Sequence, residues 1–144
     1  MKMIIPAALI AAVLVAPAIA DPKHHDGGRK LGAALSGAVE VPPGDPDGTG
    51  MFSGTVNPGQ TKVCYTLSVA RIATATMAHI HRGAAGVVGP PVVMLKTPAS
   101  GHSAACALVT RDLAKELISN PAGFYVNVHN AAYPAGAVRG QLIK

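Results

Sequence analysis

Histidine is the residue type in this sequence best placed to do chemistry, and its spacing favours a metal site. His79 and His81 are separated by a single residue inside an apolar segment. Residues two apart on a β-strand project from the same face with backbones ~6.6 Å apart, so both rings can approach one ion. His129 ends another apolar segment and supplies a third imidazole. Three imidazoles are a workable ligand set for copper or zinc and leave one coordination position open.

The same histidines also have a purely structural interpretation, because His-x-His is a short pattern of low specificity. Their rings could instead hydrogen-bond the backbone of the Gly-rich segment that follows, which contains Gly83, Gly86 and Gly89. These glycines, together with Asn127, are the candidate residues of a ligand-binding patch. A phosphate-binding P-loop is excluded, because no Lys-Ser/Thr pair follows the glycines and no helix is expected there.

Residues for other catalytic chemistry are few, so the sequence assigns no catalytic residue. There is no Gly-x-Ser-x-Gly motif, and no serine has an obvious base beside it in the chain. Carboxylates are scarce and no two look convergent, which argues against a hydrolase with paired acids. Glu40 and Arg139 are instead expected to form an ion pair that joins the first and last strands.

Short alternating apolar segments separated by Gly- and Pro-rich turns predict the strands that must position these side chains. The expected strands cover 31–41, 51–56, 63–69, 73–81, 92–96, 104–109, 124–129 and 137–143. One helix is expected over 111–119 with Thr110 as its N-cap, and Gly59 is expected in a type II turn. This pattern indicates an all-β fold: an antiparallel β-sandwich of Greek-key or immunoglobulin-like type with about eight strands and one short helix, or a small barrel.

The N-terminal part of the chain has the layout of an export signal. Residues 1–20 combine a basic start, an apolar run and an Ala-x-Ala cleavage pattern, as in a secretory signal peptide. Residues 21–30 are polar or carry Gly and Pro, which predicts a disordered leader that contains His24 and His25. Residues 31–144 suit one domain, and no other segment is apolar enough to span a bilayer. The expected location is therefore the periplasm or the cell exterior.

Two cysteines, Cys64 and Cys106, are expected to form one structural disulfide in an exported chain. In a reducing compartment they would be a pair of buried thiols. The formal net charge is +5, but the basic residues are scattered and aromatic residues are few. These features argue against a nucleic-acid partner. The sequence does not indicate an oligomeric state.

Four ordered motifs together resemble the chordin-type (CHRD) domain. They are Val39-Glu40-Val41-Pro42-Pro43, Ala78-His79-Ile80-His81-Arg82-Gly83 with Gly86 and Gly89, Tyr125-Val126-Asn127-Val128-His129, and Arg139-Gly140-Gln141-Leu142. The similarity covers about residues 31–142 and is to the bacterial secreted single-domain kind, including the positions of both cysteines. The resemblance implies the fold and the location outside the cytosol. It implies no settled enzymatic activity.

The resulting hypothesis is a secreted or periplasmic CHRD-domain binding module without catalytic activity, whose partner is a protein or a glycan. The alternative is a copper- or zinc-binding protein that uses His79, His81 and His129. Superoxide-dismutase-like redox activity is the most distant alternative, because those enzymes carry further His and an Asp in a zinc loop, and the loop after His81 contains neither residue type. A metal site predicts that the three rings converge, whereas a binding module predicts an exposed apolar or Gly-rich patch.

Overall fold

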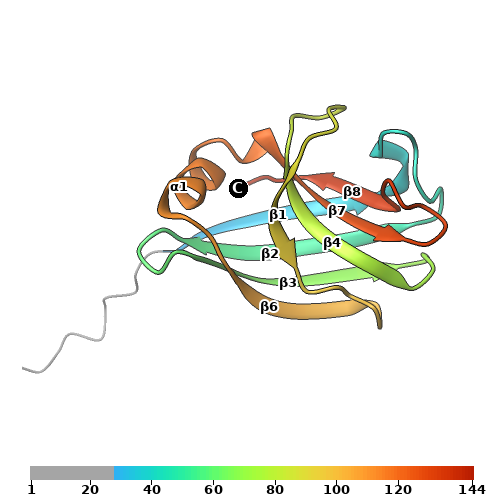
Figure 1. The fold of residues 1–144 in the computed structure, drawn as a ribbon, viewed down its shortest axis with the longest axis horizontal. Coiled ribbons are helices and arrows are strands. Elements are labelled where there is room, and N and C mark those ends of the chain that lie inside the picture. The colour runs from blue at the N-terminus through green and yellow to red at the C-terminus, as the bar shows by residue number, and fades with distance from the viewer. Residues whose placement is uncertain (1–27) are drawn as a thin grey trace, which may run out of the picture.

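The computed structural model describes residues 28–144, so the expected signal peptide and most of the expected leader lie outside the described residues. Eight antiparallel strands and one α-helix form the described chain, which confirms the all-β prediction (Figure 1). The elements are β1 (Arg29–Ser36), η1 (Gly37–Val39, a 3₁₀ turn), β2 (Thr49–Asn57), β3 (Lys62–Ala70), β4 (Ala75–Arg82), β5 (Pro91–Leu95), β6 (His102–Leu108), α1 (Arg111–Ser119), η2 (Pro121–Gly123, a 3₁₀ turn), β7 (Phe124–Asn130) and β8 (Val138–Gln141).

All eight strands belong to one sheet, in the order β5-β4-β7-β8-β1-β2-β3-β6. The sheet curls until its edge strands β5 and β6 approach each other, which makes a nearly closed barrel (Figure 1). Across this gap Ser103 Oγ donates to the Lys96 carbonyl at 2.7 Å, and the Lys96 N–H donates to Tyr65 Oη at 2.6 Å. The two layers expected of a sandwich are therefore two halves of one continuous sheet.

The inside of the curled sheet is an apolar core, built from the alternate residues that each strand turns inward. Its members include Leu31, Leu35, Phe52, Leu67, Ile80, Phe124, Val126 and Val128. Helix α1 covers one end of the barrel and buries Ala114 and Leu117, which lie three apart on one helix face (Figure 1). Thr110 caps this helix as predicted, because its Oγ1 accepts the Leu113 N–H at 3.1 Å.

Strand β1 is displaced along the chain relative to the sequence prediction of 31–41. It begins at Arg29, two residues early, because the start of β1 pairs with the end of β2. It ends at Ser36, because the chain turns sharply at Gly37. A Cβ at Gly37 would overlap the backbone of Asp45, so this turn needs a glycine.

The prediction of a type II turn at Gly59 is wrong. That turn would require a positive φ at Gly59, but the residue with a positive φ in this hairpin is Thr61, at +48°. The Asn57 side chain accepts the Gln60 N–H at 3.0 Å and thereby holds the turn in a different shape.

Cys64 and Cys106 form the predicted disulfide. They are directly opposite each other on β3 and β6, so the bond ties the edge strand β6 to the sheet. Among the described residues, no helix has both the length and the apolar character needed to cross a membrane.

Candidate metal centre

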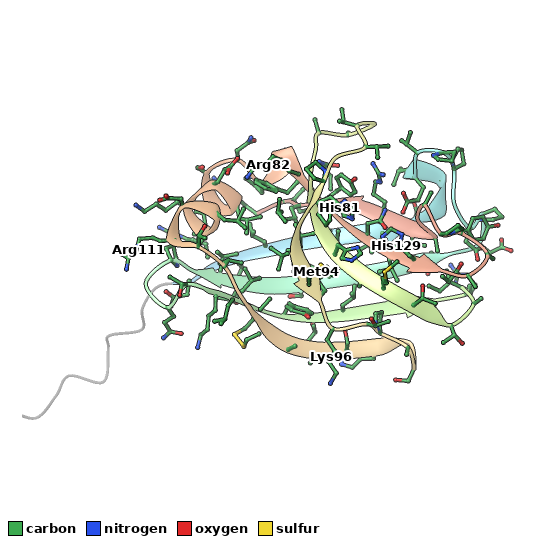
Figure 2. All side chains as sticks on the ribbon, in the orientation of Figure 1. His81, Arg82, Met94, Lys96, Arg111 and His129 are labelled. Carbon is green, nitrogen blue, oxygen red and sulfur yellow. A yellow bond between two sulfur atoms is a disulfide. The ribbon has the colours of Figure 1, made fainter. Side chains whose placement is uncertain are left out.

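The three histidines singled out by the sequence lie on neighbouring strands and on one face of the sheet. His79 and His81 are on β4, and His129 is on β7, which pairs with β4. Ala78 and Ile80 of β4 point into the core, so the alternating histidines project from the outer face. The side chains of His81 and His129 can be followed in Figure 2.

The three imidazoles converge. One ring nitrogen from each lies within 4.8 Å of the other two, and His79 Nδ1 is 3.2 Å from His129 Nε2. The ring centroids are 5.1 Å apart for His79 and His129, 5.3 Å for His79 and His81, and 6.1 Å for His81 and His129. Two nitrogens bound to one ion at ~2.0–2.1 Å with a tetrahedral angle would be about 3.3 Å apart. The His79–His129 pair meets this spacing, and the group as a whole, within 4.8 Å, would bind one ion after its rings move closer together.

Backbone carbonyls orient two of the three rings. His81 Nδ1 is 2.8 Å from the Gly89 carbonyl, and His129 Nδ1 is 2.9 Å from the Pro134 carbonyl. Because a carbonyl oxygen can only accept, each Nδ1 carries the proton and each Nε2 carries a lone pair. His81 Nε2 has no partner, whereas His129 Nε2 can accept from His79 Nδ1 at 3.2 Å. Metal-binding histidines are held in this way, with the second ring nitrogen hydrogen-bonded to fix the tautomer.

Burial favours the neutral form of the three rings. His79, His81 and His129 are 7%, 9% and 7% exposed. This burial is the main cause that lowers the pKa of all three imidazoles below the usual value, and repulsion among the rings lowers it further for His79 and His81. The positive charge of Arg139 also lowers the pKa of His81 and His129. Neutral imidazole is the form that binds metals.

Two buried side-chain atoms of the described chain have no hydrogen-bond partner, and both belong to this region. They are His81 Nε2 and Asn127 Oδ1. Asn127 is directly opposite His79 in the pairing of β4 with β7. A buried polar atom without a partner costs ~1–3 kcal/mol, so both atoms need an explanation. An ion between the histidines would bind Nε2, and a water on that ion could donate to Oδ1.

A buried ion pair adjoins the cluster. Arg139 Nε donates to Glu40 Oε2 at 3.0 Å, which confirms the predicted link, and Asn127 Nδ2 donates to Glu40 Oε1 at 2.7 Å. Burial raises the pKa of Glu40 to about 7, against the lowering effect of Arg139. Asn127, predicted as a ligand-binding residue, therefore hydrogen-bonds the ion pair at Glu40 and lies directly opposite His79 on the neighbouring strand.

Tyr125 makes a second connection, and the sequence analysis assigned it no role. The Arg139 guanidinium lies 3.9 Å from the centroid of the Tyr125 ring. That ring stacks on His81, with centroids 4.9 Å apart and an interplanar angle of 10°. The alternation of Tyr125, Asn127 and His129 on one face of β7 was the available signal, but it does not show which strand lies alongside.

The predicted glycines have different positions relative to the cluster. Gly89 is part of it, because its carbonyl holds His81 and a Cβ on it would overlap the Arg82 carbonyl. The Gly83 carbonyl accepts from Gln141 Nε2 at 2.7 Å and so anchors the loop. Gly86 lies on the exposed part of the loop with φ +78° and no neighbour around its Cβ position.

The fold and the cluster together define an all-β domain that carries three buried histidines on the outer face of its sheet. The chain belongs to the CHRD domain family, whose model matches residues 31–142. This range contains the whole cluster and all of the strands except the first two residues of β1. Neither a curated protein nor a solved structure matched the chain.

Proposed function

We propose that this CHRD domain is a secreted or periplasmic metal-binding module that holds copper or zinc between His79, His81 and His129. The convergence of three buried ring nitrogens is the observation that carries the proposal. Three imidazoles leave a coordination position for water or for a further ligand. The chain binds the ion in this proposal and does not turn over a substrate.

The residues around the cluster have distinct roles in this proposal. The Gly89 and Pro134 carbonyls hold the rings of His81 and His129 with Nε2 toward the ion. Asn127 orients a water on the ion through its unpartnered Oδ1. The Arg139 side chain stacks on the Tyr125 ring, and Tyr125 stacks on His81 and so keeps the His81 ring in place.

Two features of the chain support export. The disulfide between Cys64 and Cys106 is the kind of bond that persists in oxidising compartments. The residue pattern over 1–20 is that of a secretory signal peptide. Both support a periplasmic or extracellular location.

Calorimetric titration with copper and with zinc tests the proposal. The protein is expressed from its full-length sequence with His24 and His25 replaced by Ala, so that these two histidines cannot contribute. We expect one ion per chain, and we expect the double variant His79→Ala/His81→Ala to lose at least 100-fold in affinity.

His102→Ala is the matched control, because His102 begins β6 and lies outside the cluster. It should bind as tightly as the parent protein. Circular dichroism should show the same β-sheet content for all three proteins. The absence of stoichiometric binding in the parent, or unchanged binding after the double replacement, would contradict the proposed function.

A second candidate function is recognition of a protein or glycan partner by the loop over residues 83–90. Val87 and Val88 are 50% and 65% exposed, so the loop presents an apolar patch. The variant Val87→Ser/Val88→Ser should lose any partner found by crosslinking or on a glycan array, with metal binding intact. A partner retained by this variant would rule out the loop as its binding site.

A further inference from the structure

Two of the three methionines in the described residues stand beside the histidine cluster. Met77 on β4 is directly opposite His129 on β7, and Met94 on β5 is directly opposite His79 on β4. Directly opposed residues of antiparallel strands project from the same face, with Cβ atoms ~4.5–5.5 Å apart. Each methionine therefore lies beside one of the three histidines, on the face from which the rings project. The positions of Met94, His81 and His129 can be compared in Figure 2.

Both methionines are exposed, although the rings beside them are buried. Met77 is 46% exposed and Met94 is 67% exposed. Neither therefore gains the full stabilisation of a buried core side chain. An unbranched methionine side chain with this much freedom can rotate its sulfur toward an ion. Because both are exposed and lie beside the buried rings, the two methionines border the cluster on its solvent side.

The cluster offers an ion no negative charge. In the described part of the chain the only group of convergent metal-ligand side chains is the histidine triad, without a carboxylate. Both oxygens of Glu40, the acid nearest in the network, are engaged by Arg139 and Asn127. The Arg139 guanidinium is itself stacked on the ring that stacks on His81.

This electrostatic setting favours an ion of low charge. The cost of burying an ion without a counter-charge grows with the square of its charge, and repulsion by a nearby cation grows in proportion to it. Zn²⁺ and Cu²⁺ would keep two unneutralised charges among neutral ligands. Cu⁺ would keep one.

We infer that the cluster binds copper in the cuprous state, with at least one thioether from Met77 and Met94 beside the imidazoles of His79, His81 and His129. This inference rests on the proposed metal-binding function and narrows it to one ion. Thioethers are soft ligands that favour Cu⁺, whereas imidazole is a ligand for both copper and zinc. The binding step transfers no electron and releases no proton, since the ion arrives as Cu⁺ and every ligand is neutral.

Competition against a chromophoric Cu⁺ chelator under anaerobic, reducing conditions tests this inference, with Zn²⁺ titrated in parallel. The protein is again expressed from its full-length sequence without His24 and His25. The variant Met77→Leu/Met94→Leu preserves side-chain volume and removes both sulfurs. We expect it to lose at least tenfold in Cu⁺ affinity and to keep its Zn²⁺ affinity.

Met51→Leu is the matched control, because Met51 is an equally exposed methionine on β2, away from the cluster. It should leave the affinity for both ions unchanged. Copper K-edge absorption should detect a sulfur ligand in the parent protein and none in the double leucine variant.

The outcomes separate the inference from the function on which it rests. If His79→Ala/His81→Ala abolishes Cu⁺ binding but Met77→Leu/Met94→Leu does not weaken it, the thioether inference is overturned and the metal site stands. If the parent protein binds neither Cu⁺ nor Zn²⁺, both the inference and the proposed function fail.

Discussion

Glu40 shows how a single side chain can join distant parts of this chain. Its carboxylate receives hydrogen bonds from Arg139 and Asn127, and it packs against Gly136. A Cβ at Gly136 would overlap this carboxylate, and the φ of +149° at Gly136 also disfavours other residues. Because the carboxyl group is removed from water, its pKa rises to about 7.

The raised pKa predicts a pH dependence of stability. Between 4.5, the ordinary pKa of the carboxyl group, and about 7, the folded protein binds a proton that the unfolded chain does not. The free energy of unfolding of the parent should therefore fall, relative to that of Glu40→Gln, as the pH rises through this range. The fall should be at most ~3 kcal/mol. Urea unfolding of both proteins at several pH values measures it.

The histidines are present in both proteins, so the difference between the two isolates Glu40. A difference that stays constant from pH 4.5 to 7 would show that Glu40 is ionised throughout.

The sequence was sufficient to predict the three histidines as a group, because the two-residue period of a strand places His79 and His81 on one face. The same period put Asn127 on the side of His129. It also places Met77 on the face of His79 and His81, but it could not indicate Met94, because the position of Met94 depends on the register between strands. That register is set by the packing of the whole sheet rather than by any local pattern.

At the scale of elements, the loop between β4 and β5 is the part that completes the cluster. It returns to β4 because the Arg82 N–H donates to the Pro90 carbonyl at 3.0 Å. This return brings the Gly89 carbonyl to His81 Nδ1. The Gly89 N–H also donates to Tyr125 Oη at 3.2 Å, so the loop is fastened on both sides of the stacked rings.

Replacing Gly89 should disturb the cluster without touching a histidine. In Gly89→Ala the new Cβ would meet the Arg82 carbonyl, which is backbone and cannot rotate away. We expect the loop to shift, the His81 ring to lose its fixed orientation, and metal affinity to fall at least tenfold. Calorimetric titration measures the affinity.

Gly86→Ala is the comparison for this prediction. Its Cβ would have open space, but its φ of +78° makes the substitution cost about 1 kcal/mol of stability. Metal affinity should remain that of the parent. Equal affinities for both variants would mean that the Gly89 carbonyl does not orient His81.

The elements were predictable where local periodicity decides, and less so where a distant contact does. The helix over 111–119 and its Thr110 cap follow from side-chain spacing and capping chemistry. The end of β1 does not, because the chain turns at Gly37 to meet Asp45, eight residues further on. The hairpin at Gly59 was mistaken because the Asn57 side chain competes with the turn that Pro-Gly favours.

At the scale of the whole molecule, the stabilising disulfide and the histidine cluster lie in different halves of the sheet. Cys64 and Cys106 join β3 to β6, whereas the cluster is on β4 and β7. Along the sheet order three strands, β8, β1 and β2, lie between these pairs, and across the gap between the edge strands β5 lies between β6 and β4. Since neither cysteine is on a strand that carries the cluster, stability and metal binding should be separable.

Removing the disulfide tests this separation. The bond closes a loop with a sequence separation of 42 residues, and the chain-entropy model gives ~4 kcal/mol for such a loop. Cys64→Ala/Cys106→Ala should lower the free energy of unfolding by about 2 to 4 kcal/mol in urea. Its metal affinity at low temperature should equal that of the parent, and a coupled loss of affinity would contradict the separation.

Strand β8 is only four residues long, yet it is the ladder through which β7 meets β1 in the described sheet. The segments β1-β2-β3-β6 and β5-β4-β7 are therefore joined through residues near the C-terminal end of the sequence. In chain order β8 follows the other seven strands of the described sheet. Until Val138–Gln141 is synthesised, the facing edges of β7 and β1 lack the strand that pairs with both, so the complete sheet can form only after the other seven described strands exist.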